Sequence, residues 1–307
     1  MISQDSASYD QEKQTTVAQS SVSASSGVTS PDPAKIVREV NANSFAFRDV
    51  SLTVPTSQGP RQLLSSLEGV VRGGRMTALM GCSGAGKTTL LNTLAQRSSS
   101  DGAITGTIHM NGQPLLDSFR RKVGYAEQMD LHEDTSTVLE AVRFSALLRQ
   151  PASIAIAEKY AHCDEILDML ELRDVANAII GVPGRGLSAE TRKMVTIAVE
   201  LAARPDTLLF LDEPTSGLDS AAAFNVVRAL RKLADSGLAI LCTIHQPSSN
   251  LLGLFDDLLL LAPGGRCVYN RALGSDGHEM IDYFERMGAS PCISGDNPGK
   301  RCGLVPR

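Results

Sequence analysis

The chain of 307 residues lacks any run of about 18 or more apolar residues, the minimum for a helix that crosses a bilayer. Its longest apolar-rich stretch, residues 251–262, is interrupted by Asp256 and Asp257. The N-terminus begins Met-Ile-Ser-Gln-Asp and has no apolar core of the kind found in secretion signals. We therefore expect that the chain itself does not span a membrane.

Paired cysteines and an excess of basic residues are also missing. None of the six cysteines stands in a Cys-x-x-Cys pair, and the five histidines lack metal-ligand spacing, which argues against a disulfide framework and a structural zinc site. The formal net charge is −5. Because phosphate neutralisation requires clustered lysine and arginine, we expect no nucleic-acid partner.

The composition divides the chain into three parts. Residues 1–40 are rich in Ser, Gln, Thr and Asp and cannot bury enough apolar surface to offset chain entropy, which predicts a disordered leader. Residues 41–298 alternate strand and helix patterns, typical of an α/β domain with a mostly parallel sheet. Helical periodicity over 138–172 indicates a helical insertion, and residues 299–307 form an irregular tail.

A glycine-rich motif follows the apolar strand predicted at 76–80. Residues 81–88 fit G-x-x-x-x-G-K-[ST] and open a predicted helix over 88–96. Glycines let backbone N–H groups point at phosphate oxygens, and the helix N-terminus adds a positive dipole end. Lys87 is expected to reach the β- and γ-phosphates of ATP, and Thr88 to ligate Mg²⁺. The expected ATP-binding residues are Gly81, Cys82, Ser83, Gly84, Ala85, Gly86, Lys87, Thr88 and Thr89.

Two carboxylates follow a second apolar strand. Asp212 and Glu213 end the strand predicted at 207–211, and parallel strands present their C-terminal residues at the ligand crevice. We expect Asp212 to hold Mg²⁺ and Glu213 to orient and deprotonate the attacking water. Two solvated acids capping a strand are the alternative, and the phosphate motif favours the catalytic interpretation.

The residues after these acids resemble ATP-binding cassette (ABC) proteins. The run Asp-Glu-Pro-Thr-Ser-Gly-Leu-Asp-Ser at 212–220 resembles the Walker B and D-loop block, and Ile-His-Gln-Pro at 244–247 the H-loop. Tyr-Ala-Glu-Gln at 125–128 resembles the Q-loop, and Leu-Ser-Ala-Glu-Thr at 187–191 occupies the signature position. Further runs at 243–248, 264–269 and 280–284 are similar to the G subfamily, in particular the second cassette of fungal pleiotropic drug resistance transporters.

The resemblance, which covers about 41–298, implies a fold and a set of roles. The fold is a P-loop NTPase with a RecA-like core, an antiparallel β-subdomain and a helical subdomain at about 126–200. Gln128 senses the γ-phosphate and Mg²⁺, His245 bonds the γ-phosphate, and Asp219 communicates across a dimer interface. The implied catalytic residues are Glu213, His245, Gln128 and Lys87, and the implied metal ligands are Thr88, Gln128 and Asp212.

The chain departs from the family at two places. Ser188 of the signature is followed by Ala189 and Glu190 instead of two glycines. Two like charges about 4 Å apart cost about 4 kcal/mol at an effective dielectric of 20, so Glu190 opposes ATP closure unless it points away. We therefore expect one productive site, formed by these Walker motifs and a partner's signature.

The second departure concerns the adenine platform. Many cassettes stack the base on an aromatic side chain near the end of the first strand, where this chain has Ser51 and Leu52. Phe45 and Phe47 lie upstream, where core positions are the simpler interpretation. The sequence therefore predicts poor discrimination between ATP and GTP.

Together these features predict a Mg-dependent ATP-binding and ATP-hydrolysing domain that powers export of small, hydrophobic compounds. Its expected partners are a membrane domain, on a separate chain or in a missing C-terminal part, and a second cassette with an intact signature. Its expected place is the cytoplasmic face of a membrane, or solution if it is alone. The alternatives are a truncated cassette that binds nucleotide without transport and a P-loop small-molecule kinase, which phosphate release without an acceptor would distinguish from an ATPase.

Overall fold

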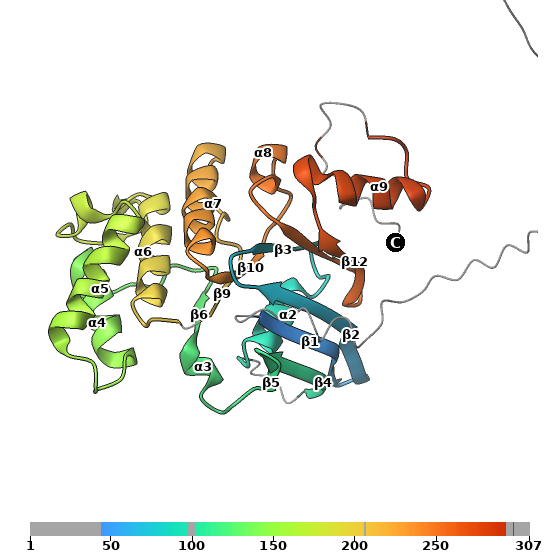
Figure 1. Cartoon of the computed structure of the whole chain (residues 1–307), viewed down its shortest axis with the longest axis horizontal. Helices are drawn as coiled ribbons and strands as arrows, with labels where there is room; N and C mark the ends of the chain where they lie inside the picture. Colours follow the sequence, from blue (N-terminus) through green and yellow to red (C-terminus); the bar gives the residue numbers. More distant parts are fainter. Residues whose placement is uncertain (1–43, 98–101, 206, 293–296, 298–307) are drawn as a thin grey trace, which may run out of the picture. The chain divides into compact units, whose positions relative to one another are not determined.

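The computed structural model describes residues 44–97, 102–205, 207–292 and 297 (Figure 1). The predicted leader at 1–40 and tail at 299–307 lie outside these described residues, so both remain predictions, as do the boundaries 41–298. No helix within the described ranges has the length and apolar character needed to cross a bilayer.

A six-stranded sheet in the order β12-β11-β3-β10-β9-β6 forms the centre of the fold. Its strands are β3 (Met76–Gly81), β6 (Val123–Ala126), β9 (Leu208–Leu211), β10 (Ala239–Thr243), β11 (Asp257–Ala262) and β12 (Arg266–Ala272). Each strand is parallel to its neighbour except β12, which forms an antiparallel hairpin with β11. The carboxyl ends of β3, β10, β9 and β6 consequently meet at one edge.

A second, antiparallel sheet has the order β2-β1-β4-β5. It consists of β1 (Ser44–Thr56), β2 (Gly59–Arg72), β4 (Ala103–Met110) and β5 (Gln113–Pro114). Together with α2 (Lys87–Leu94) it covers one face of the central sheet (Figure 1). This sheet is the predicted antiparallel β-subdomain.

The central strands bury both of their faces, and alternate residues enter different cores. In β9, Leu208 and Phe210 pack in the core shared with β1, β2 and α2, whereas Leu209 and Leu211 pack in the core shared with the remaining helices. This alternation follows from the pleat, which turns successive side chains to opposite faces. A continuous apolar run is therefore what a doubly covered strand requires.

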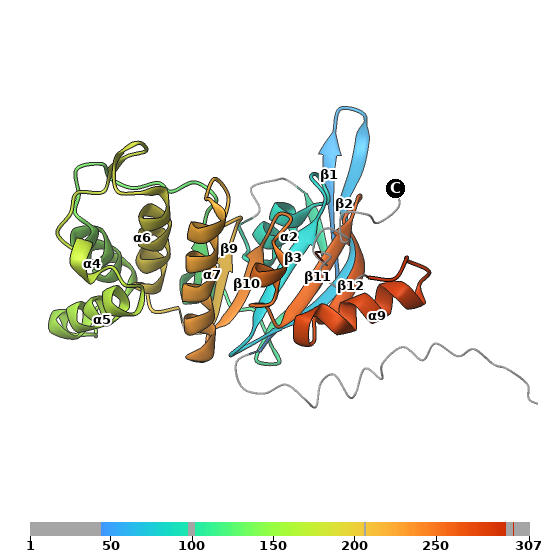
Figure 2. The same cartoon turned by 90° about the horizontal axis from the view of Figure 1, so that it is seen from above.

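The helices on the other side include the helical insertion. α4 (Val138–Arg149), α5 (Ile156–Met169) and α6 (Ala189–Leu201) pack together at the left of Figures 1 and 2. α7 (Ser220–Asp235) packs on β10 and contacts both α6 and α8 (Ser249–Leu252), while α9 (His278–Arg286) packs on β12. The short helices are α3 (Phe119–Lys122), η1 (Arg173–Val175) and η2 (Ser275–Gly277).

The observed architecture confirms the predicted α/β fold with an antiparallel β-subdomain and a helical insertion. The sequence prediction missed β6, α3, α8 and the small hairpin of β7 (Gly181–Val182) and β8 (Arg185–Gly186). β6 is four residues long and contains Gly124, which obscures a strand pattern. A Cβ at Gly124 would lie 2.6 Å from Leu209 Cδ1, so the glycine leaves room for the Leu209 side chain of the neighbouring strand β9.

Candidate nucleotide site

The glycine-rich loop joins β3 to α2. Gly86 precedes the helix with a φ of 98°, in the left-handed region that favours glycine. A Cβ at Gly81 would lie 2.6 Å from the carbonyl oxygen of Leu261, so this position also requires glycine. The loop exposes its central residues, Cys82, Ser83 and Gly84. It therefore presents backbone at the surface while both ends are held by packing.

Lys87 lies folded over this loop. Its side chain is largely buried, and Nζ donates to the carbonyl oxygens of Gly81, at 3.0 Å, and Cys82, at 3.3 Å. The ammonium is thus held beside the exposed backbone of the loop, and its contact with a phosphate tail stays a prediction.

Asp212, at the end of β9, joins two other elements. Its Oδ1 accepts hydrogen bonds from Thr88 Oγ1, at 3.2 Å, and from Thr243 Oγ1, at 2.7 Å. Thr88 belongs to α2 and Thr243 ends β10, so the carboxylate lies where the loop, β9 and β10 meet. The two predicted metal ligands Thr88 and Asp212 are therefore adjacent.

The surroundings of Asp212 keep neighbouring groups neutral. Burial, reinforced by the Asp212 carboxylate, raises the pKa of the Tyr125 hydroxyl and of the Cys242 thiol. Both groups are therefore even harder to ionise than usual, and they stay neutral beside the Asp212 carboxylate.

Glu213 has an unusual backbone conformation. Its φ is 47°, in the left-handed region that residues other than glycine seldom adopt, and such strain is common at functional sites. Its N–H donates to Thr243 Oγ1 at 2.6 Å, and its Oε2 accepts from Gln128 Nε2 at 3.0 Å. Gln128 follows β6, so the two predicted catalytic residues come from neighbouring strands and contact each other.

Thr243 is a site residue to which sequence reasoning assigned no role. It is fully buried, accepts a hydrogen bond from Glu213 and donates one to Asp212, and so fixes both acids. A polar residue at the end of the otherwise apolar β10 was the available signal. Its meaning depends on β10 lying beside β9, which the linear sequence does not state.

These side chains fit Mg²⁺. The hydroxyl of Thr88, the carboxylate of Asp212 and the amide of Gln128 offer oxygen donors, which this hard cation prefers. Magnesium is commonly held by one or two carboxylates together with substrate phosphates, and the cluster lies directly beside the phosphate loop.

His245 lies just beyond β10 and is exposed. Its neighbour Ile244 anchors the backbone by donating to the carbonyl oxygen of Leu79 at 3.1 Å. Among the described residues, the His245 ring makes no hydrogen bond or ion pair. The fold therefore places His245 at the edge where the other site residues meet, and its role stays a prediction.

The signature residues lie elsewhere. Ser188 caps α6 by accepting from the N–H of Thr191 at 3.1 Å, and α6 packs on β6, which is separated from β3 by β9 and β10. Asp219 caps α7 by accepting from the N–H groups of Ala221 and Ala222, each at 2.9 Å. The chain therefore does not bring its own signature to its own phosphate loop.

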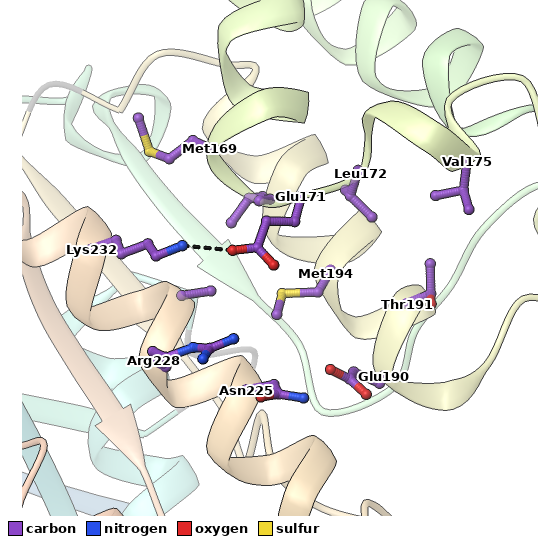
Figure 3. Close-up of a pocket in the computed structure, with 12 residues that line it drawn as sticks. Met169, Glu171, Leu172, Val175, Glu190, Thr191, Met194, Asn225, Arg228 and Lys232 are labelled. Carbon is purple, nitrogen blue, oxygen red and sulfur yellow. Dashed lines mark hydrogen bonds and ion pairs between the residues drawn. The ribbon is translucent and has the colours of Figure 1, made fainter.

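Glu190 lines a pocket of about 180 Å³ between α6 and α7. Figure 3 shows its carboxylate on the side of the pocket where Asn225 and Arg228 of α7 lie. Across the pocket, Lys232 pairs with Glu171 at 2.7 Å. In the single chain Glu190 thus faces the pocket, and Ala189 beside it is exposed.

The two aromatic side chains of β1 among the described residues, Phe45 and Phe47, are buried and do not offer a free ring to a base. Phe45 and Phe47 are core residues, and Phe45 stacks on Phe119 with ring centroids 5.7 Å apart. Leu52 is buried, and Ser51 Oγ accepts from the N–H of Ser66 at 2.8 Å.

We expect ATP and GTP to bind with dissociation constants within about threefold of each other, because without a stack worth about 1–3 kcal/mol per base the affinity depends on the triphosphate, which both nucleotides share. Competition of each nucleotide against a fluorescent ATP analogue, with Mg²⁺ present, measures the ratio. A preference for ATP of about tenfold or more would contradict this expectation.

Comparison with known proteins gives three kinds of similarity. The family model for ABC transporters matches residues 64–216. The chain is 56% identical over 258 residues to the ABC multidrug transporter G of Aspergillus fumigatus, covering 84% of this chain and 19% of the relative. It is 52% identical over 256 residues to the ABC multidrug transporter AFR2 of Cryptococcus neoformans, covering 83% of this chain and 17% of the relative.

The solved structures support the fold. A dimeric structure of a bacterial ABC transporter cassette matches with a TM-score of 0.61 and 24% identity, covering 74% of this chain and 98% of that chain. An ATP-binding subunit of an ABC transporter matches with a TM-score of 0.61 and 23% identity, covering 80% of this chain and 95% of that chain. The chain spans less than a fifth of the length of the curated relatives described above.

Proposed function

We propose that this chain, which belongs to the ABC transporter family, binds and hydrolyses Mg-ATP to drive export of small hydrophobic compounds. It is a nucleotide-binding domain homologous to fungal multidrug transporters of the G type. The observation that carries this proposal is the meeting of three segments at one edge of the sheet. Thr88 bonds Asp212 at 3.2 Å, and Gln128 bonds Glu213 at 3.0 Å, beside the phosphate loop and Lys87.

The proposed chemistry is the attack of water on the γ-phosphorus, which breaks its bond to the β–γ bridging oxygen and leaves ADP and inorganic phosphate. The N–H groups of the loop and the ammonium of Lys87 bind the phosphate tail, while Thr88, Asp212 and Gln128 hold the metal. Bound Mg²⁺ supplies positive charge that neutralises the phosphate oxygens. Glu213 orients the water and accepts its proton on a carboxylate oxygen, so the side chains contribute mainly positioning and charge.

The proposal extends to His245, whose exposed ring would hydrogen-bond the γ-phosphate and stabilise charge in the transition state. Asp219, exposed at the start of α7, would lie at a dimer interface. A membrane domain and a second cassette are the proposed partners, which would place the domain at the cytoplasmic face of a membrane. The relatives are named multidrug transporters, which supports drug-like small compounds as the transported class.

The experiment that tests this function is phosphate release from ATP without any acceptor. The chain would be mixed with a second cassette whose signature contains Ser-Gly-Gly, and inorganic phosphate would be measured with Mg²⁺ and with EDTA. Mg-dependent release supports the proposal. Formation of ADP only after an acceptor molecule is added, with the phosphoryl group on the acceptor and no free phosphate, would indicate a kinase instead.

The altered signature leads to a separate prediction about dimers of this chain alone. Replacing Ala189 and Glu190 by glycine is expected to raise ATP-dependent self-association at least tenfold, because a Glu190 carboxylate turned out of the pocket to about 4 Å from a partner's phosphate would cost about 4 kcal/mol at a dielectric of 20. Sedimentation with Mg-ATP, in a Glu213→Gln background that prevents turnover, measures the dimer. Glu171→Gly is the control, because its carboxylate lies across the same pocket.

This asymmetry would be contradicted if the unaltered chain formed ATP-dependent dimers as readily as the glycine variant. It would also be contradicted if the unaltered homodimer hydrolysed two ATP molecules at the rate of the mixed pair.

A further inference from the structure

Side chains of α6 hold the segment that follows β6. The ladder of β6 ends at Ala126, whose carbonyl oxygen accepts from the N–H of Asp212 at 2.9 Å. Beyond this point, Lys193 Nζ donates to the carbonyl oxygen of Gln128 at 2.9 Å and pairs with Asp130 Oδ1 at 2.8 Å. Lys193, which lies on α6 together with residues of the signature, therefore hydrogen-bonds the main chain of Gln128, a predicted catalytic residue.

The ammonium of Lys193 is buried, with 3% of its side chain exposed. A buried charge is costly unless it is paired and hydrogen-bonded, and here Asp130 and the Gln128 carbonyl satisfy it. Asp130 is itself fixed by α6, because Thr196 Oγ1 donates to its Oδ1 at 2.6 Å. The segment that follows β6 is therefore held by polar contacts to side chains of one helix, α6.

The contacts continue into the proposed active site. Lys193 bonds the main chain of Gln128, and the Gln128 side chain bonds Glu213 at 3.0 Å. Gln128 and Lys193 are 65 positions apart in the sequence, so the link exists only in the fold. Moving the Gln128 main chain by about an ångström would carry its side-chain amide away from Glu213 and from the other proposed metal ligands, Thr88 and Asp212.

We propose that Lys193 is a positioning residue, whose ammonium fixes the Gln128 main chain so that the amide can act on the metal and on Glu213. This inference rests on the proposed function. Groups that orient a metal ligand typically change metal affinity by about 10- to 100-fold when they are removed. Loss of Lys193 should therefore reduce the amount by which Mg²⁺ strengthens ATP binding.

Lys159 of α5 provides a matched control. Its ammonium is also buried, with 4% of the residue exposed, and its Nζ donates to the carbonyl oxygen of Gln150 at 3.1 Å. The two lysines differ in the carbonyl that they hold, since Gln150 lies at the end of α4 and not at the nucleotide site, and Lys193 also pairs with Asp130. Methionine at either position removes the charge and keeps the length of the side chain.

The test measures the ATP dissociation constant of the whole chain by calorimetry, once in EDTA and once in Mg²⁺. The ratio of the constant in EDTA to the constant in Mg²⁺ is called the Mg²⁺ gain. Lys193→Met is expected to lower this ratio about tenfold. Lys159→Met should leave the ratio unchanged, and both variants should keep the ATP affinity in EDTA. Gln128→Ala should lower the ratio similarly, and the double variant Gln128→Ala/Lys193→Met should match Gln128→Ala alone.

Asp130→Asn/Lys193→Met guards against misfolding, because it removes both charges and leaves no carboxylate unpaired. The Mg²⁺ gain of this double variant should stay about tenfold below that of the unaltered chain, while its melting temperature approaches that of the unaltered chain. The inference is overturned if Lys193→Met keeps the full ratio, or if its effect adds to that of Gln128→Ala. Absence of any Mg²⁺ gain in the unaltered chain would overturn the proposed function as well.

Discussion

Replacing Lys87 with methionine is expected to weaken binding of Mg-ATP by about 100-fold, which corresponds to about 3 kcal/mol. The ammonium lies beside the exposed loop, held by the carbonyl oxygens of Gly81 and Cys82. Charge-assisted hydrogen bonds to phosphate contribute about 1.5–3 kcal/mol each, and methionine offers none. Equilibrium dialysis with labelled ATP measures the change.

Lys159→Met is the matched control for Lys87→Met, because it removes another largely buried ammonium that bonds a backbone carbonyl. It should bind Mg-ATP as the unaltered chain does. Equal affinities for Lys87→Met and the unaltered chain would show that the loop does not bind the phosphate tail.

Replacing Glu213 with glutamine is expected to reduce ATP turnover by about 1000-fold, within the range attributed to a positioned general base. Glutamine keeps the shape of the side chain and its contact with Gln128, but it cannot accept the proton of the attacking water. The affinity for Mg-ATP should change by no more than about twofold, because the loop, Lys87 and Thr88 remain intact. Single-turnover hydrolysis in the mixture with a second cassette separates these effects.

Glu171→Gln is the control for Glu213→Gln, since it neutralises a carboxylate that pairs with Lys232 away from the loop. Its turnover should equal that of the unaltered chain. If Glu213→Gln kept at least a third of the turnover, another group would have to be the base.

The sequence was sufficient where chemistry lies in a continuous motif. The places of the predicted phosphate loop and of the pair Asp212–Glu213 in the fold could be predicted from short runs, because a tight loop before a helix and acids after an apolar strand occupy fixed places in an α/β sheet. The alternation within β9, and the burial of Phe45 and Phe47, follow from the same local patterns.

The sequence was insufficient where the site depends on which strands are neighbours. Thr243 fixes Asp212 and Glu213 from the adjacent strand β10, and Lys193 reaches Gln128 across 65 positions. The direction of Glu190 depends on the packing of α6 near α7, which no local pattern states. These contacts are tertiary, and residue type alone did not distinguish them from ordinary core or surface positions.

The most direct test of the account is the affinity of the folded chain for ATP as a function of Mg²⁺ concentration, measured by isothermal titration calorimetry. The arrangement of Lys87, Thr88, Asp212 and Gln128 predicts saturable binding that strengthens as Mg²⁺ is added. A correctly folded sample that binds no ATP, or binds it equally well with and without Mg²⁺, would contradict the assignment of this edge of the sheet as a nucleotide site.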